Sequence, residues 1–147
     1  MRVGVAVRGI YYTHAIAGHP KCGRLHGHAG RVELSVDGPL QSNGMVEDFG
    51  ELKHVLRQMT EPLDHRTLVP DAEIHPEGRR WVWKNADGER VLLEHDPYIL
   101  GVTVVTAENL AQWVLGNLIS SMPPSIRSAT VRFYETDDSY AEATWQR

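Results

Sequence analysis

A cysteine and two histidines lie close together in the stretch Cys22–His28, CGRLHGH, and Cys22 is the only cysteine of the chain. His26 and His28 are separated by a single glycine. If the chain is extended there, both imidazoles leave the same face of the strand. Converging neutral imidazoles are ligands that Zn²⁺ accepts, and a set of three leaves a fourth coordination position open for water or a substrate. The spacing therefore indicates metal chemistry.

A third histidine, His14, lies near the end of the strand that is expected to precede this stretch. A hairpin-like return of the chain would bring it beside His26 and His28. We therefore predict a Zn²⁺ site formed by these three residues. The spacing alone leaves open the alternative that all three are surface histidines of a loop. The remaining histidines, which show no such geometry, are left outside the site: His19, His54, His75 and His95.

The thiol of Cys22 has more than one interpretation. A free cysteine is often a small buried hydrophobic residue. However, Lys21, Gly23 and Arg24 are polar or flexible neighbours and would make a poor core. Beside an open zinc site, the sulfur could act as a general base or occupy the fourth coordination position.

Two further groups could take part in chemistry. Asp64 precedes His65 in the stretch LDHRTL, a carboxylate beside an imidazole in a loop after a helix, although such pairs are also frequent by chance. Glu135 ends an apolar strand in VRFYET. Its carboxylate could cap a turn, or it could bind a guanidine-like edge of a ligand through two charge-assisted hydrogen bonds.

The elements that must position these groups begin with two strands. Val, Ile and Tyr dominate the first dozen residues, and alternation in RVELSV indicates a half-buried antiparallel strand at 31–36. A helix is expected in 47–63, with Asp48 as its N-cap and Pro62 at its end. Its apolar stripe consists of Phe49, Leu52, Val55, Leu56 and Met59.

The second half of the chain again combines an amphipathic helix with strands. A second helix should begin after the N-cap Thr106, with Glu108 in its first turn and an apolar stripe of Leu110, Trp113, Val114 and Leu118. The remaining expectations are a loop at 63–78, a hairpin at 79–96 with its turn at 85–88, a strand at 99–105 and a final strand pair at 129–136 and 140–145. Strands with amphipathic helices on one face predict an α+β domain.

The composition is that of an ordinary globular domain. The 147 residues fit a single domain, 41% of them are hydrophobic and 23% are charged. The net charge of −4 gives no indication of a nucleic-acid partner. No apolar run is long enough to span a membrane, and the N-terminus lacks the features of a signal peptide. With only one cysteine, we expect a cytoplasmic protein.

The motifs together resemble those of the 6-pyruvoyl-tetrahydropterin synthase family, and within it the 6-carboxytetrahydropterin synthases of queuosine and archaeosine biosynthesis. The matching pieces follow one another over almost the whole chain: His14, CGRLHGH, GMVEDFGELK, LDHRTL, TAENLA and FYET. The cysteine and the histidine pair are spaced as in the carboxytetrahydropterin branch.

This resemblance implies a tunnelling fold, in which an antiparallel sheet carries two helices on one face. Such chains assemble into a barrel as homo-oligomeric trimers or hexamers, with active sites between subunits. It also implies Zn²⁺ on His14, His26 and His28. Cys22, Asp64 and His65 would be the proton-transfer set, and Glu135 would anchor the pterin.

The implied reaction converts 7,8-dihydroneopterin triphosphate to 6-carboxytetrahydropterin, with release of acetaldehyde and triphosphate. The alternatives are a 6-pyruvoyl-tetrahydropterin synthase or related pterin side-chain lyase, and a non-catalytic oligomer that binds zinc and pterin. Lys21, Arg24 and Arg66 are weak candidates for contacts with the triphosphate.

The chain also departs from the family pattern. IYYTH stands where Phe-x-Ala-x-His is usual, AG follows His28, and Val105 replaces a frequent proline. Residues of about 73–97 form a longer segment than many members carry, expected to be an inserted hairpin within a single domain of residues 1–147. It could lengthen the sheet, cover the rim of the barrel or reshape the mouth of the pocket.

Overall fold

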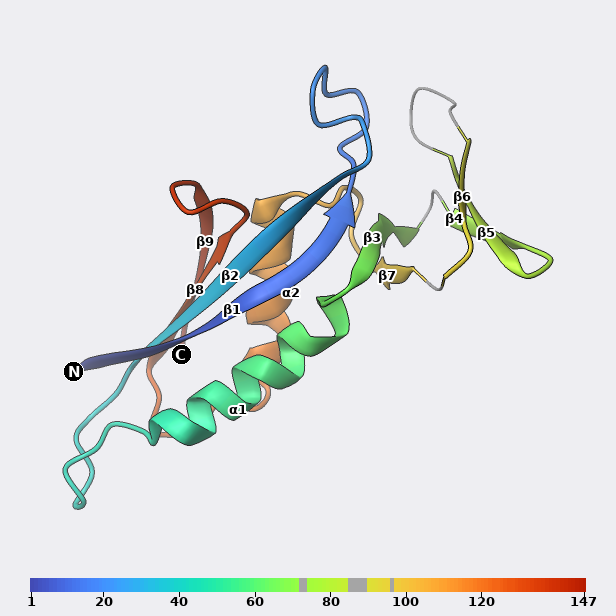
Figure 1. Cartoon of the computed structure of the whole chain (residues 1–147). Coiled ribbons are helices and arrows are strands. Elements are labelled where there is room, and N and C mark those ends of the chain that lie inside the picture. The colour runs from blue at the N-terminus through green and yellow to red at the C-terminus, as the bar shows by residue number, and fades with distance from the viewer. Residues whose placement is uncertain (72–73, 85–89, 96) are drawn as a thin grey trace.

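Two long antiparallel strands, β1 (Arg2–His14) and β2 (His26–Asp37), form the centre of the structure (Figure 1). This computed structural model describes residues 1–71, 74–84, 90–95 and 97–147. One strand ends and the other begins at a predicted ligand: His14 is the last residue of β1, and His26 is the first residue of β2. The predicted strand at 31–36 is confirmed but is longer than the alternation indicated.

Four further strands complete a six-stranded sheet with the order β7-β3-β1-β2-β8-β9. β8 (Ser128–Tyr134) and β9 (Tyr140–Gln146) form the predicted antiparallel pair beside β2. β3 (Arg66–Pro70) and β7 (Tyr98–Leu100) run parallel to β1 at the other edge. The sheet is therefore mixed rather than wholly antiparallel.

Two local predictions are wrong at this parallel edge. The segment expected to be a loop contains β3, whose Leu68 and Val69 are fully buried. The strand expected at 99–105 stops at Leu100, and the chain then bends toward the second helix. Both errors have one cause. Short parallel strands such as β3 and β7 are stabilised by neighbours far away in the sequence, which a local pattern does not reveal.

The segment expected to be an inserted hairpin forms a second antiparallel sheet of β4 (Ile74–Glu77), β5 (Arg80–Lys84) and β6 (Arg90–Leu93). The predicted turn at 85–88 lies outside the described residues. In Figure 1 this sheet extends away from the long sheet on the side of β3 and β7. Trp83 is 1% exposed and packs with Ala15 and Val69, and Ile74, Val91 and Leu93 of the second sheet pack against the same small cluster.

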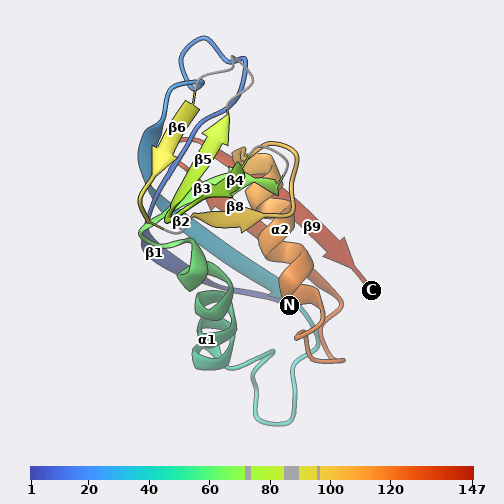
Figure 2. The ribbon, with the colours of Figure 1, turned by 90° about the vertical axis from the view of Figure 1, so that its right-hand side faces the viewer.

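Helices α1 (Phe49–Thr60) and α2 (Ala107–Ile119) lie side by side against the long sheet (Figure 2). Both predicted N-caps are present: Asp48 accepts from the amides of Gly50 and Glu51, and Thr106 accepts from the amide of Asn109. Pro62 lies in a short 3₁₀ turn, Glu61–Leu63, which ends the first helix.

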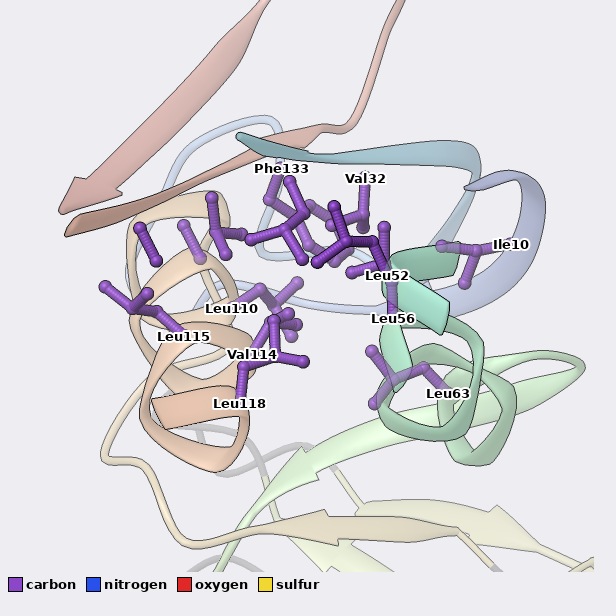
Figure 3. Packing of buried hydrophobic residues seen from close by; sticks show 14 of the residues in the cluster. Ile10, Val32, Leu52, Leu56, Leu63, Leu110, Val114, Leu115, Leu118 and Phe133 are labelled. Atoms are coloured by element: carbon purple, nitrogen blue, oxygen red, sulfur yellow. The ribbon is translucent and has the colours of Figure 1, made fainter. Parts of the chain in front are cut away.

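The two helices bury one continuous apolar core against one face of the sheet (Figure 3). Leu52 and Leu56 contribute from α1, and α2 contributes Leu110, Val114 and Leu118. Phe49 was expected in the apolar stripe, but it is 58% exposed because it stands in the first turn, beyond the edge of the core.

A β-bulge in β1 decides which face of the sheet receives His14. Arg8 pairs with Arg31 and Ile10 pairs with Gly30, so Gly9 is an extra residue without a partner in β2. Before the bulge, the odd-numbered valines Val3–Val7 pack on the core. After the bulge, the even-numbered residues Ile10, Tyr12 and His14 lie on that same face. Because side chains alternate along a strand, one extra residue turns His14 toward the core.

Deleting Gly9 should remove this change of phase, so that either Val3–Val7 or His14 must turn to the opposite face. We expect the folded deletion variant to lose most of its bound metal, measured by atomic emission after dialysis against Zn²⁺. Gly9→Ala is the matched control, because it keeps the residue count. Gly9 has φ 74°, so the alanine should cost about 1–2 kcal/mol in urea unfolding while metal binding persists. A folded deletion variant with wild-type metal content would contradict this role of the bulge.

Candidate metal centre and active site

The three predicted ligands His14, His26 and His28 meet at the ends of β1 and β2. His14 pairs directly with His26 in the strand register, and the ligand atoms of all three side chains lie within 4.8 Å of one another. The ring centroid of His14 lies 4.7 Å from that of His26 and 5.0 Å from that of His28. The structure therefore brings together every histidine assigned to the metal site.

In two of these imidazoles, a hydrogen bond to a backbone carbonyl determines which ring nitrogen is left to bind a metal. Nδ1 of His14 lies 2.8 Å from the carbonyl oxygen of Val105, and Nδ1 of His26 lies 2.7 Å from that of Arg24. In each ring Nδ1 must carry the proton, because a carbonyl can only accept, and Nε2 is left with a free lone pair. Such outer partners are typical of metal-binding histidines.

The distances fit a metal ion. Nε2 of His14 lies 3.1 Å from Nε2 of His28. Two nitrogens bound to one tetrahedral zinc ion at about 2.0–2.1 Å would lie about 3.3 Å apart. Among the residues that the structure describes, this is the group of three that could hold a metal. It leaves the fourth tetrahedral position for another ligand.

Burial keeps His14 in the form that binds a metal. Removal from water lowers the pKa of His14 to about 4, and the imidazoles of His26 and His28 act in the same direction. The carbonyl of Val105 opposes this shift but does not cancel it. His14 is therefore neutral at pH 7 without needing a metal to displace a proton.

Glu135, predicted as the ligand anchor, directly follows β8 and faces this cluster. Its Oε1 lies 3.6 Å from Nε2 of His14, and its side chain is 21% exposed. The hydroxyl of Tyr12 donates to the same oxygen at 3.3 Å. Burial raises the pKa of Tyr12 above its ordinary value, and the Glu135 charge and this hydrogen bond raise it further, so the hydroxyl stays protonated.

The sequence analysis did not single out Tyr12, although the structure places it at the centre of the site. It is 3% exposed and pairs directly with His28 in the strand register. The signal was present in its spacing, because Tyr12 stands two residues before His14 and must share its face once the strand is recognised.

Asp64 and His65 form the predicted pair, but they lie against the other face of β1. Oδ2 of Asp64 is 2.9 Å from Nδ1 of His65, and Oδ1 accepts from the amide of Tyr11 at 2.8 Å. Although partial burial opposes it, the Tyr11 amide and His65 hold the pKa of Asp64 below its usual value. The ring of His65 packs on that of Tyr11, whose side chain points away from Tyr12 and His14.

His65 is also held in an uncommon backbone conformation. Its φ is 56°, in the left-handed region, and its amide donates to the carbonyl of Tyr11 at 2.5 Å. The side chain itself remains 76% exposed. A restrained backbone with an exposed imidazole is a feature that recurs at functional sites.

Cys22 lies in the loop between β1 and β2 and is partly buried. Its amide donates to Nδ1 of His19 at 2.9 Å, and its carbonyl accepts from the amide of Ile16 at 2.7 Å. In the described part of the chain its sulfur does not join the three imidazoles, so the interpretation as a fourth metal ligand gains no support.

A pocket of about 640 Å³ lies beside these groups, and its lining falls into four runs: Tyr11–Thr13, Gly27–Ala29, His65–Thr67 and Leu92–His95. Strand alternation places Tyr11, Thr13, Gly27 and Ala29 on the face opposite the imidazoles. The pocket is therefore centred on the side of the Asp64–His65 pair. Leu92–His95 form one wall of this pocket, and β4, β5 and β6 make a sheet of their own, so the inserted segment does not lengthen the long sheet.

Solved structures with this arrangement of sheet and helices define the class of fold. A 6-pyruvoyl tetrahydropterin synthase from Plasmodium vivax superposes with a TM-score of 0.87 at 21% identity, covering 100% of this chain and 99% of the other. The corresponding protein from Caenorhabditis elegans gives a TM-score of 0.64 at 20% identity, covering 100% and 95%. The chain has the tunnelling fold of these proteins.

The sequence comparisons then define the family. The family model described as 6-pyruvoyl tetrahydropterin synthase matches residues 8–146, and the chain belongs to this family of pterin synthases. A putative 6-carboxy-5,6,7,8-tetrahydropterin synthase from Pyrococcus abyssi is 33% identical over 84% of this chain and 76% of its own length. The 6-carboxy-5,6,7,8-tetrahydropterin synthase of Haemophilus influenzae is 29% identical, over 88% and 89%. The 6-pyruvoyl tetrahydrobiopterin synthase of Poecilia reticulata is 30% identical, over 76% and 60%.

Neither α1 nor α2 offers a membrane span: among the described residues, no helix is both long and apolar enough to cross a bilayer.

His14→Ala should remove one imidazole and lower the affinity for Zn²⁺ by at least about a hundredfold, since even outer partners of metal ligands are worth about 10–100-fold. Competition with a chromophoric chelator measures this affinity. His54→Ala is the matched control, because His54 is exposed on α1 and should bind Zn²⁺ as the wild type does. Equal losses in the two variants would show that the cluster is not the metal site.

Proposed function

We propose that this chain is a zinc-dependent 6-carboxy-5,6,7,8-tetrahydropterin synthase. It converts 7,8-dihydroneopterin triphosphate and water to 6-carboxytetrahydropterin, acetaldehyde and triphosphate, a carbon–oxygen lyase reaction of the 7-deazaguanine pathway. The observation that carries the proposal is the open three-histidine cluster beside Glu135 in a chain of the pterin synthase family. The carboxy branch is favoured by the relatives of that name and by the spacing of Cys22 to the histidine pair.

Zn²⁺ is the metal that suits three neutral imidazoles with an open fourth position. When bound by His14, His26 and His28, it would supply Lewis-acid stabilisation of negative charge developing on an oxygen of the substrate side chain. The carbonyls of Val105 and Arg24 hold two of these rings in the required tautomer, so the chain is organised for a metal before one arrives.

The remaining residues have separate tasks in this proposal. The Glu135 carboxylate binds the guanidine-like edge of the pterin through charge-assisted hydrogen bonds. Cys22 removes a proton from a carbon of the substrate side chain. His65, polarised by Asp64 at 2.9 Å, takes up and returns protons. Arg66 lines the pocket and is the better placed of the three cationic candidates for the triphosphate, since Lys21 and Arg24 do not line it.

The placement of Asp64 and His65 supports a homo-oligomer with shared sites. Within one chain this pair packs on Tyr11, across β1 from the imidazoles. A substrate on the metal would meet such a pair from a neighbouring copy more directly than that of its own chain. A trimer or hexamer closed through the sheet edges would provide that neighbour. We place this assembly in the cytoplasm, where its single cysteine stays reduced.

Product analysis separates the carboxy branch from its relatives. Zinc-loaded protein is incubated with 7,8-dihydroneopterin triphosphate, and the products are identified by mass spectrometry. Carboxytetrahydropterin with acetaldehyde is the expected result. A pyruvoyl product would assign the chain to the activity named for the Poecilia reticulata relative. Unchanged substrate would favour a protein that only binds zinc and pterin, or one with a different substrate.

Cys22→Ala should distinguish an enzyme from a binding protein. The thiol is not part of the three-histidine cluster, so zinc content and pterin binding should remain at the wild-type level. Turnover should fall by about 10²–10⁴-fold, which is the usual contribution of a positioned general base. Full turnover in this variant would exclude Cys22 from proton transfer.

A further inference from the structure

Tyr12 is the buried aromatic residue that joins the imidazole cluster to Glu135. Its ring lies 5.4 Å from that of His14 and 5.6 Å from that of His28, centroid to centroid. Phe133 closes the third side at 5.9 Å. Gly30 leaves the room that this ring needs, because a Cβ there would meet Cε1 of Tyr12 at 3.2 Å. The hydroxyl is therefore held in one place by packing on several sides.

Glu135 stands where it could close the metal site. Its Oε1 is 3.6 Å from Nε2 of His14, close to the separation of about 3.3 Å expected between two ligands of one tetrahedral zinc ion. A small rotation would bring this carboxylate oxygen onto the fourth position. A bound carboxylate would exclude the substrate oxygen and would no longer be available to a pterin.

We propose that Tyr12 is a positioning residue whose hydroxyl holds the Glu135 carboxylate beside the fourth coordination position but off the metal. The hydrogen bond of 3.3 Å from Tyr12 Oη to Glu135 Oε1 is the restraint. It anchors the oxygen that lies nearest to His14 and leaves Oε2 free to accept from a ligand. This inference rests on the proposed function only in naming the pterin as that ligand. The restraint of Glu135 by Tyr12 needs only the metal and these two side chains, whatever the ligand is.

Cobalt makes the restraint visible without any turnover, because the visible spectrum of Co²⁺ reports the number and kind of its ligands. Protein loaded with Co²⁺ is compared as wild type, Tyr12→Phe, Glu135→Gln and the double variant. In Tyr12→Phe the carboxylate should bind the metal, which changes the spectrum. It should also weaken binding of the probe azide by about 10–100-fold, the usual effect of an outer partner. The double variant should regain the wild-type spectrum and azide affinity, since an amide is a poor metal ligand.

Tyr134→Phe is the matched control. The Tyr134 hydroxyl donates to Oε2 of Glu33 at 3.2 Å, so this variant also removes a tyrosine–glutamate hydrogen bond from a buried tyrosine. Tyr134 points to the opposite face from Tyr12, so the control should keep the wild-type spectrum and azide affinity. Superimposable spectra and equal azide affinities for Tyr12→Phe and the wild type would overturn the proposal, as would a protein that binds no cobalt.

Turnover of 7,8-dihydroneopterin triphosphate then separates the two levels of inference. If Tyr12 holds Glu135 off the metal, Tyr12→Phe should have a lower kcat/KM than the wild type. The double variant should have the same kcat/KM as Glu135→Gln alone. If wild-type protein shows no turnover while the cobalt spectra change as expected, the proposed function fails and the restraint stands. If turnover is present but Tyr12→Phe and Tyr134→Phe are indistinguishable in both spectra and kinetics, the restraint fails and the proposed function stands.

Discussion

The pairing of β1 with β2 is the constraint on which the rest of the structure depends. One register must satisfy two requirements: the valines before Gly9 must face the core, and His14 must face His26. An unbroken strand cannot satisfy both, because the two sets have opposite parity in the sequence. The extra residue at Gly9 reconciles them, and its φ of 74° is one that glycine adopts without strain. The core and the cluster of His14, His26 and His28 therefore lie at two ends of the same face.

The histidine cluster is also connected to the helical layer, through the residues that directly precede α2. Val105 accepts from Nδ1 of His14, and the next residue, Thr106, caps the helix. The carbonyl of Val104 accepts from the Asn109 side chain at 2.7 Å, which fixes the same short segment from the other side. The orientation of the His14 ring is thus secured by a short segment that leads directly into a packed helix, which favours a preorganised site.

Much of this could be predicted from the sequence, and the strand pairings that were missed share one physical origin. The caps Asp48 and Thr106 and the alternation in β2 are local signals that the structure confirms. His-Gly-His is a local signal too, and the strand register places its first histidine opposite His14. β3 was not expected, and β7 was recognised only in part, as the beginning of a strand expected at 99–105, since their partners lie far away in the sequence. The spacing of Tyr12 to His14 already places both side chains on one face, but the local pattern does not reveal the hydrogen bond of Tyr12 to Glu135, which is 123 residues away along the chain.

Alternation in β1 also explains why one chain presents two groups of candidate site residues on opposite faces. Tyr12 and His14 lie on the face of the histidine cluster, while Tyr11 between them supplies an amide and a ring to Asp64 and His65. Neighbouring side chains of one strand leave opposite faces, so within one chain the two sets approach a ligand from different sides of β1. If the imidazoles and the Asp64–His65 pair act on the same molecule, two copies joined through their sheet edges would bring the two faces together more directly. The geometry of one strand then favours an oligomer as the functional unit.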